Sequence, residues 1–309
     1  MIIYDIVFGT DTGQVLCPFH DDTIMSAGIG PNGEFHCFAC GEKAHDEVGF
    51  IAKYFGVGLE RATKIRNALE KSQSFKYAQG SLVDYQLDYL RKIGLADDVI
   101  NKYFFCSSTG KLMYRHTWNG ITISNTWFNS PMLPNHNAGA PKYKYDSTMI
   151  GGMVTPYDDT AYSSLLICEG EKDMLTAKSM GFKNAVAKIG GAKTYIIGGL
   201  NFMNKNIVIV YDCDDAGREG AIQDALILSE RFKCKVKVVD LGLADKEDLN
   251  DYFIKYGHTA QDFQTLVANT PVFVPTVQIK TSRLEKFVDG LSLEEAKDLL
   301  AIIRVKHGI

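Results

Sequence analysis

The chain contains two pairs of candidate metal ligands near its start. The first pair is Cys17-Pro-Phe-His20, and sixteen intervening residues separate it from Cys37-Phe-Ala-Cys40. Each pair places two ligands about one turn apart, which is the spacing of zinc knuckles. Three thiolates and one imidazole fill all four positions of a tetrahedron and leave none for water. The pattern therefore predicts a structural zinc ion, not a catalytic metal.

Two further histidines, His36 and His45, compete with His20 for the fourth ligand position. We rank His20 first because Cys-x-x-His matches the spacing of the partner pair. The chain has seven cysteines in all, too few and too unevenly spaced for a disulfide framework. This usage indicates a reducing compartment.

Carboxylates follow two apolar runs of the second half of the chain. The run LLIC leads directly into Glu169-Gly-Glu171-Lys-Asp173, and IVIVYD leads into Asp212-Cys-Asp214. If both runs are parallel strands, their acids meet at one edge of the sheet. Clustered carboxylates repel one another unless a cation lies among them, and hard oxygen ligands suit Mg²⁺ or Mn²⁺. We therefore expect a catalytic divalent-metal site at Glu169, Asp212 and Asp214.

A third acidic group follows the run KVKVVD and could add Asp248 to the same site. Asp251 belongs to this group as well. For Asp251 the alternative of a solvated acid at a helix start stays open, since the helix dipole favours a carboxylate there.

The elements that would position these residues follow from the apolar pattern. Short apolar runs alternate with helical stretches from residue 161 onward, which predicts a parallel sheet with crossover helices. Residues 47–72 carry apolar side chains at helical spacing, and Asn119-Gly120 between alternating segments predicts a hairpin. The fold class is α/β, or α+β over the whole chain. The four runs are LLIC (165–168), NAVAKI (184–189), IVIVYD (207–212) and KVKVVD (235–240).

The formal net charge of −4 conceals a strong segregation of charge. Residues 1–50 carry one lysine against eight acids, whereas 51–80 carry six basic residues against two acids. Residues 99–145 contain no acid and interleave basic with aromatic side chains. This mixture fits a groove that tracks phosphates and stacks bases, although the aromatics could equally be core residues.

Composition excludes several classes of protein. The 309 residues are 46% hydrophobic and 23% charged, an ordinary globular balance that excludes a disordered or collagenous chain. No apolar run approaches the roughly 20 residues of a membrane span, and the start lacks the basic segment of a signal peptide. We expect a soluble cytoplasmic protein, in the host cytoplasm if the gene is viral.

The order of these motifs resembles one family. CPFH and CFAC, then a basic helical region, then ICEGEKD and VYDCDDAGREG, are similar to the DnaG-like replicative primases of bacteria and phages. That family combines an N-terminal zinc-binding domain with a TOPRIM catalytic core. The resemblance covers roughly residues 15–255, and the departure to note is that the zinc unit here is acidic.

The resemblance implies a function. It implies a DNA-directed RNA polymerase of the primase type, which joins NTPs into short RNA primers on a single-stranded DNA template for DNA replication. It makes Glu169, Asp212 and Asp214 the metal-site acids, with Asp248 as a secondary one. The residues that would contact nucleotide or template are Arg115, Lys142, Lys144, Lys172 and Arg218.

The same resemblance implies a domain order. We expect a zinc ribbon over 1–55, a basic helical linker over 56–80 and the first part of the polymerase core over 81–160. The TOPRIM domain then covers 161–270, and 271–309 form a linker and a helical tail. Because no helicase module follows, a separate replicative helicase is implied. The tail could dock to it or pack on its own core.

Two other readings use the same acids. A TOPRIM nuclease would cleave strands with divalent metal, and a recombination mediator would bind DNA without catalysis. The nuclease class usually carries an ATPase, and the mediator's zinc site uses four cysteines after a helical DNA-binding motif. Neither pattern matches this chain as well as the primase pattern does.

Overall fold

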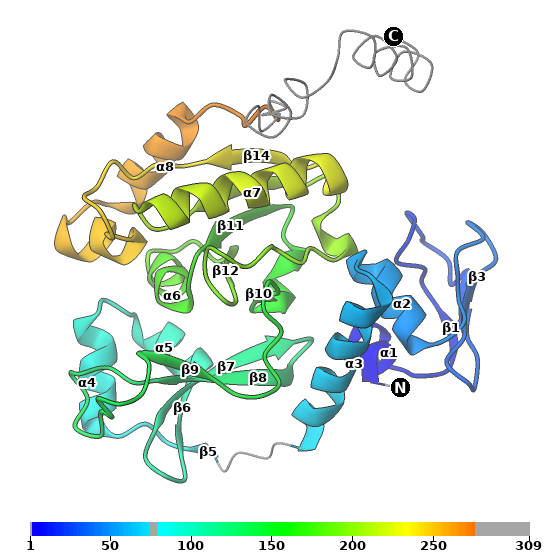
Figure 1. Cartoon of the computed structure of the whole chain (residues 1–309), viewed down its shortest axis with the longest axis horizontal. Coiled ribbons are helices and arrows are strands. Elements are labelled where there is room, and N and C mark those ends of the chain that lie inside the picture. Colours follow the sequence, from blue (N-terminus) through cyan, green and yellow to red (C-terminus); the bar gives the residue numbers. More distant parts are fainter. Residues whose placement is uncertain (1, 75–78, 276–309) are drawn as a thin grey trace, which may run out of the picture. The chain divides into compact units, whose positions relative to one another are not determined.

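The computed structural model describes residues 2–74 and 79–275 (Figure 1). The described residues up to Phe273 form one compact unit. Of the predicted linker and helical tail over 271–309, residues 276–309 lie outside the described residues. Among those that are described, no helix is long and apolar enough to cross a membrane.

The N-terminal part of the chain is a four-stranded antiparallel sheet with its strands in chain order. Aromatic rings from the sheet and its flanking helices pack together: Phe50 lies 4.7 Å from Tyr4 and 5.2 Å from Phe35, between ring centroids. These rings form a small aromatic core beside the sheet. The strands are β1 (Gly13–Val15), β2 (Ala27–Ile29), β3 (Phe35–Cys37) and β4 (Lys43–Ala44), and the helices are α1 (Ile2–Phe8), α2 (Glu47–Phe55) and α3 (Leu59–Ser74).

The second sheet is also antiparallel, with five strands in chain order. Its central hairpin turns at Asn119 and Gly120, whose φ values of 46° and 72° are those of a type I′ turn, as predicted. Most aromatic side chains of this region are buried, so the core explanation is right for them. The strands are β5 (Gln79–Gly80), β6 (Phe104–Ser107), β7 (Leu112–Trp118), β8 (Ile121–Phe128) and β9 (Tyr143–Tyr145), with α4 (Asp84–Lys92) and α5 (Asp97–Tyr103).

The third sheet contains all four predicted strands, and its order is β10-β12-β11-β13-β14. Strands β11 to β14 are parallel, which confirms the α/β class, but β10 joins as an antiparallel edge strand that the sequence did not indicate. The strands are β10 (Val154–Thr155), β11 (Ser164–Cys168), β12 (Ala185–Lys188), β13 (Asn206–Val210) and β14 (Lys235–Val238).

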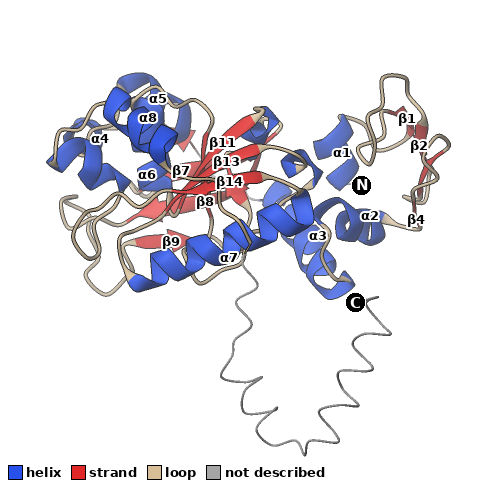
Figure 2. Ribbon diagram, turned by 90° about the horizontal axis from the view of Figure 1, so that it is seen from above, coloured by secondary structure: helices blue, strands red, loops and turns tan. Residues whose placement is uncertain are grey.

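Helices cover both faces of this sheet (Figure 2). Alternate residues of β11 point to opposite faces: Leu165 packs in one core cluster with α7 (Asp215–Phe232), and Leu166 packs in another with α6 (Glu171–Ser179) and α8 (Ala260–Asn269). The crossover from β12 to β13 has only a short 3₁₀ turn, η2 (Leu200–Phe202), where we expected a helix. The remaining elements are the 3₁₀ turn η1 (Tyr157–Ala161) and the π-helical turn η3 (Asp251–Lys255).

Candidate functional site

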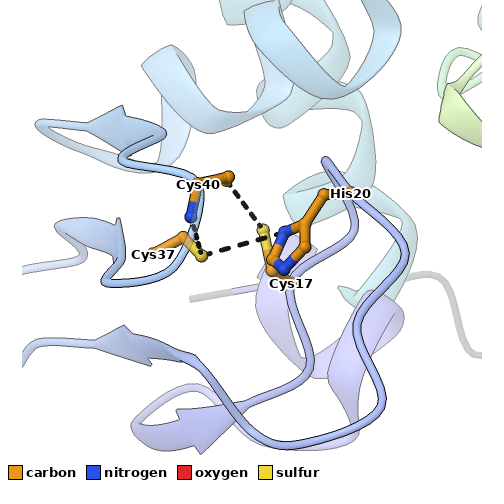
Figure 3. A group of neighbouring side chains, drawn as sticks. All are labelled: Cys17, His20, Cys37 and Cys40. Atoms are coloured by element: carbon orange, nitrogen blue, oxygen red, sulfur yellow. Dashed lines mark hydrogen bonds between the residues drawn. The ribbon is translucent and has the colours of Figure 1, made fainter.

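The four predicted zinc ligands lie together in the N-terminal sheet (Figure 3). Their ligand atoms are all within 4.8 Å of one another. Cys17 Sγ is 3.8 Å from Cys40 Sγ, and Cys37 Sγ is 3.9 Å from Nδ1 of His20. A tetrahedron with Zn–S bonds of about 2.3 Å has S···S edges of about 3.8 Å. The donor set and its spacing therefore fit a zinc ion.

Backbone groups support the thiolates. The Phe19 N–H donates to Cys17 Sγ and the Cys40 N–H donates to Cys37 Sγ, each at 3.4 Å. Asp22 accepts hydrogen bonds from the Cys17 N–H and from Ser26 Oγ, both at 2.7 Å. These bonds fix the loop that follows the first pair.

Asp22 also lies 3.7 Å from Nε2 of His20, the ring nitrogen that faces away from the cluster. This distance is longer than a hydrogen bond, so Asp22 acts on the imidazole through its negative charge. In the sequence Asp22 is one of the eight acids of residues 1–50, and nothing in its spacing singles it out. His36, the competing ligand, instead lies with its ring 4.5 Å from that of Phe38.

The proposed catalytic acids lie at the carboxyl ends of neighbouring parallel strands. Glu169 follows β11 and Asp212 follows β13. Glu169 accepts hydrogen bonds from the backbone N–H of Ala192 at 3.2 Å and of Asp212 at 3.3 Å. The backbone thus holds Glu169 between the end of its neighbouring strand and the loop after β12.

Asp214 caps the N-terminus of α7, where its carboxylate accepts from the Gly217 N–H at 2.7 Å. A Cβ atom at Gly217 would lie 2.2 Å from the carbonyl oxygen of Asp212, so only glycine fits. The turn that carries both acids is therefore fixed by this glycine. The cap satisfies one backbone donor, and the helix dipole favours the negative charge.

Crowding and burial disfavour the charged form of these acids. Burial, followed by the charges of Glu169, Asp248 and Asp214, raises the pKa of Asp212 to about 7. Burial also raises the pKa of Glu169, and that of buried Asp173 still further. Repulsion of this kind is what a bound cation would relieve.

Asp173 is a member of this acidic group that the sequence analysis quoted but did not assign. It is 5% exposed and accepts a hydrogen bond from the Asn250 N–H at 3.1 Å. The Asn250 side chain in turn donates to Ile93 O and to Thr176 Oγ1, both at 2.8 Å. The sequence does carry a signal for it, because Asp173 is the second acid after Glu169 and stands four residues beyond it.

Lys172 and Asp248 form an ion pair with 2.5 Å between Nζ and Oδ2. This contact joins a predicted nucleotide contact to a predicted secondary metal ligand. The positive charge of Lys172 lowers the pKa of Asp212 and so opposes the repulsion from the other acids. Lys172 therefore neutralises part of the negative charge of the acidic group.

The carboxylates do not close into a compact cage. Within residues 2–74 and 79–275, the Cys17–Cys40 cluster is the one group of at least three acidic, cysteine or histidine side chains whose ligand atoms lie close enough together to hold a metal ion. An open set of oxygen ligands fits Mg²⁺ or Mn²⁺, which keep several waters and take further ligands from substrate phosphates. Glu169, Asp212 and Asp214 offer such a set.

Of the other predicted basic residues, Arg115, Lys142 and Lys144 lie on or beside strands of the second sheet, and Arg218 lies on α7. Arg115 on β7 stacks over Phe105, with Cζ 5.1 Å from the ring centroid. Lys142 and Lys144 are exposed on and beside β9. Lys144 lines a pocket of about 240 Å³ with Lys111 and Trp127. Arg218, exposed on α7, lines a different pocket together with Asp212.

A buried polar network connects α6 to the second sheet. Glu171 is 2% exposed, and its carboxylate accepts from Thr126 Oγ1 at 3.3 Å and from Tyr145 at 3.4 Å. Thr126 Oγ1 is also 2.6 Å from Nε2 of His116, a fully buried side chain. Burial raises the pKa of Glu171 to about 7 and lowers that of His116 to about 3. This network ties the helix after Glu169 to strands β7, β8 and β9.

Known proteins resemble this chain both in sequence and in fold. A Toprim-like family model matches residues 166–253. The DNA primase of Lactococcus lactis is 25% identical over 78% of this chain, and that of Mycolicibacterium smegmatis is 43% identical over 18% of it. The crystal structure of the Aquifex aeolicus primase (zinc-binding and RNA polymerase domains) covers 96% of this chain and 90% of that one, with 19% identity and a TM-score of 0.52.

The match to the Aquifex structure is one of fold, given its low identity. The chain spans about half the length of the Lactococcus primase, 49% of it. Its sequence relatives are nevertheless DNA primases, and its third sheet contains the Toprim-like region. The chain is therefore similar to the DNA primases, and it combines a zinc-ribbon-like module, a mixed α+β part and a region that matches the Toprim-like family.

Proposed function

We propose that the chain synthesises short RNA primers de novo on single-stranded DNA, by metal-dependent transfer of nucleotides from NTPs. The observation that carries this proposal is the contact between Glu169 and the backbone of Asp212, 43 residues later, at the carboxyl edge of a Toprim-like sheet. The raised pKa values of both side chains support a site that receives a cation.

Glu169, Asp212 and Asp214 would hold Mg²⁺ or Mn²⁺, with Asp248 as a secondary acid. With a divalent ion held by these acids, the site would gain a charge that lowers the pKa of the attacking 3′ hydroxyl and neutralises charge on the phosphates. Lys142, Lys144 and Arg115 would bind the triphosphate, and Arg218 would contact nucleotide beside Asp212. Lys172 would keep the acids in place through Asp248. The reaction needs no covalent nucleophile on the protein.

The domain boundaries form part of this proposal. The zinc-binding module would cover 1–55, the basic linker 56–80, the first part of the polymerase core 81–160 and the Toprim domain 161–270, followed by the tail. Single-stranded DNA and NTPs would be the substrates and an RNA primer the product. A separate replicative helicase would be the partner that presents the template.

The direct test is an incubation with single-stranded DNA, four labelled NTPs and Mg²⁺ or Mn²⁺. We expect new short RNA from the native chain and none from Asp212→Asn. Asp215→Asn is the matched control, because Asp215 is a fully exposed neighbour in the same turn. Shortened DNA would instead indicate the nuclease, and neither product would indicate a non-catalytic DNA-binding protein.

A further inference from the structure

Helix α3, which follows the zinc-ribbon-like module, forms one wall of a groove of about 550 Å³. The opposite wall is the segment 147–151 together with Thr194. Figure 1 shows α3 running beside β8 of the second sheet. This groove is separate from the pockets that contain Lys144 and Asp212. None of the residues predicted to contact nucleotide lines it.

The α3 wall of the groove is basic. Arg61, Lys64 and Lys71 are spaced at i, i+3 and i+10, which places them along one face of the helix. A rise of 1.5 Å per residue spreads them over about 15 Å of the axis. The described lining residues include no Asp or Glu. Lys64 forms a 2.7 Å pair with Glu60, but both side chains are well exposed, so this pair is weak and yields to a phosphate.

Apolar side chains lie between the charges. Ile65 contributes to the α3 wall, and Met149 and Ile150 contribute to the facing wall. A groove of cations and apolar surface suits a single strand, whose phosphates and unpaired bases are both accessible. A duplex would present only its phosphates to such a groove.

The facing wall leads toward the acids. Thr194 belongs to the loop that contains Ala192, whose N–H holds the Glu169 carboxylate. Beside Thr194, Arg61 Nη2 donates to Gly151 O at 2.9 Å and so joins α3 to this wall. One loop therefore borders both the basic groove and the candidate metal site.

We infer that the groove between α3 and segment 147–151 binds the phosphate backbone of a single-stranded nucleic acid. This inference rests on the proposed function, within which the strand is the DNA template. It gives α3 a role in binding the strand, whereas the resemblance implies only a basic helical linker over 56–80.

The test measures binding alone, with the zinc-loaded full chain and no NTPs or Mg²⁺. Labelled oligo-dT is titrated at several salt concentrations against native protein and K64Q/K71Q. Two lost phosphate contacts at about 0.7 each should reduce the slope of log K against log[salt] by about 1.4. Affinity at low salt should fall about tenfold or more. The double variant K92Q/K183Q removes two exposed lysines outside the groove and should leave the slope unchanged.

The inference would be overturned if K64Q/K71Q melted like the native chain and its slope of log K against log[salt] equalled that of K92Q/K183Q. Oligo-U in place of oligo-dT distinguishes the sources of the strand: tighter binding of oligo-dT supports the template, and tighter binding of oligo-U overturns that assignment. The outcome is independent of catalysis. A groove that binds DNA in a chain that makes no RNA would refute the proposed function only, and RNA synthesis with an unchanged K64Q/K71Q would refute the groove only.

Discussion

Lys188 and Asp224 form an ion pair inside the Toprim-like sheet, with 2.6 Å between Nζ and Oδ2 and both side chains at most 1% exposed. The Asp224 carboxylate also accepts from the Tyr211 hydroxyl at 2.6 Å and from the Ile196 N–H at 2.9 Å. Lys188 Nζ donates in addition to Ala192 O at 3.3 Å. The pair therefore fixes the loop 192–196, whose first residue also holds Glu169.

Loss of one member of this pair should destabilise the chain strongly. Lys188→Met leaves the Asp224 charge buried without its partner, and we expect a loss of about 3–5 kcal/mol in the free energy of unfolding. K188M/D224N should recover much of that loss, because Asn carries no charge, its Oδ1 accepts from the Ile196 N–H and its Nδ2 donates to the Tyr211 hydroxyl oxygen. Urea denaturation measures both variants.

The control for these variants is Lys53→Met, which breaks the partly exposed Lys53–Glu42 pair. It should lower the free energy of unfolding by less than about 1 kcal/mol. If the effects of K188M and Asp224→Asn simply add, the two side chains are not coupled and the explanation of the loop's position is wrong.

The pKa of Asp212 predicts how stability changes with pH. The pKa of Asp212 is about 7 in the folded chain, against an ordinary value of 3.8. Between these two pH values the folded chain therefore binds more protons at Asp212 than the unfolded chain does. Stability should therefore fall as pH rises from about 4 through 7. At pH 8, Asp212→Asn should raise the free energy of unfolding by on the order of 1–2 kcal/mol relative to the native chain. This is less than the free energy that corresponds to the whole pKa shift, because solvent screens a partly exposed site.

Added Mn²⁺ should stabilise the native chain more at pH 8 than at pH 5.5, since the ion binds ionised carboxylates. It should stabilise Asp212→Asn less. Thermal melts with and without Mn²⁺ at the two pH values measure this, with Asp215→Asn as the control that should behave like the native chain. Equal Mn²⁺ effects on all three proteins would exclude Asp212 as a ligand.

The contacts of Asp22 with Cys17 and His20 predict that Asp22 contributes to the zinc affinity of the module. Asp22→Ala removes the acceptor of the Cys17 N–H and the carboxylate beside His20. We expect zinc affinity to fall about 10–100-fold, as for other carboxylates beside a metal-bound histidine. Competition with a chromogenic chelator gives the affinity. Asp21→Ala, at the exposed neighbouring acid, should retain native affinity, and an equal loss in both variants would contradict the prediction.

Local pattern was enough to predict the main elements. Cys-x-x-His and Cys-x-x-Cys specify their own knuckles, because the ligand geometry is set within four residues. The apolar runs before Glu169 and Asp212 indicated parallel strands, and parallel strands bring their carboxyl ends to one edge. The Asn119-Gly120 turn likewise follows from the φ values that these two residues tolerate.

Tertiary structure alone decided which side chains meet across long sequence distances. Lys172 with Asp248, Lys188 with Asp224 and Glu171 with Thr126 are separated by 76, 36 and 45 residues. No local periodicity encodes such partners, because they depend on strand order and on how helices pack over the sheets. The sequence thus determined the chemical groups and the strands that carry them, whereas packing decided which charges are neutralised and which remain to bind a cation.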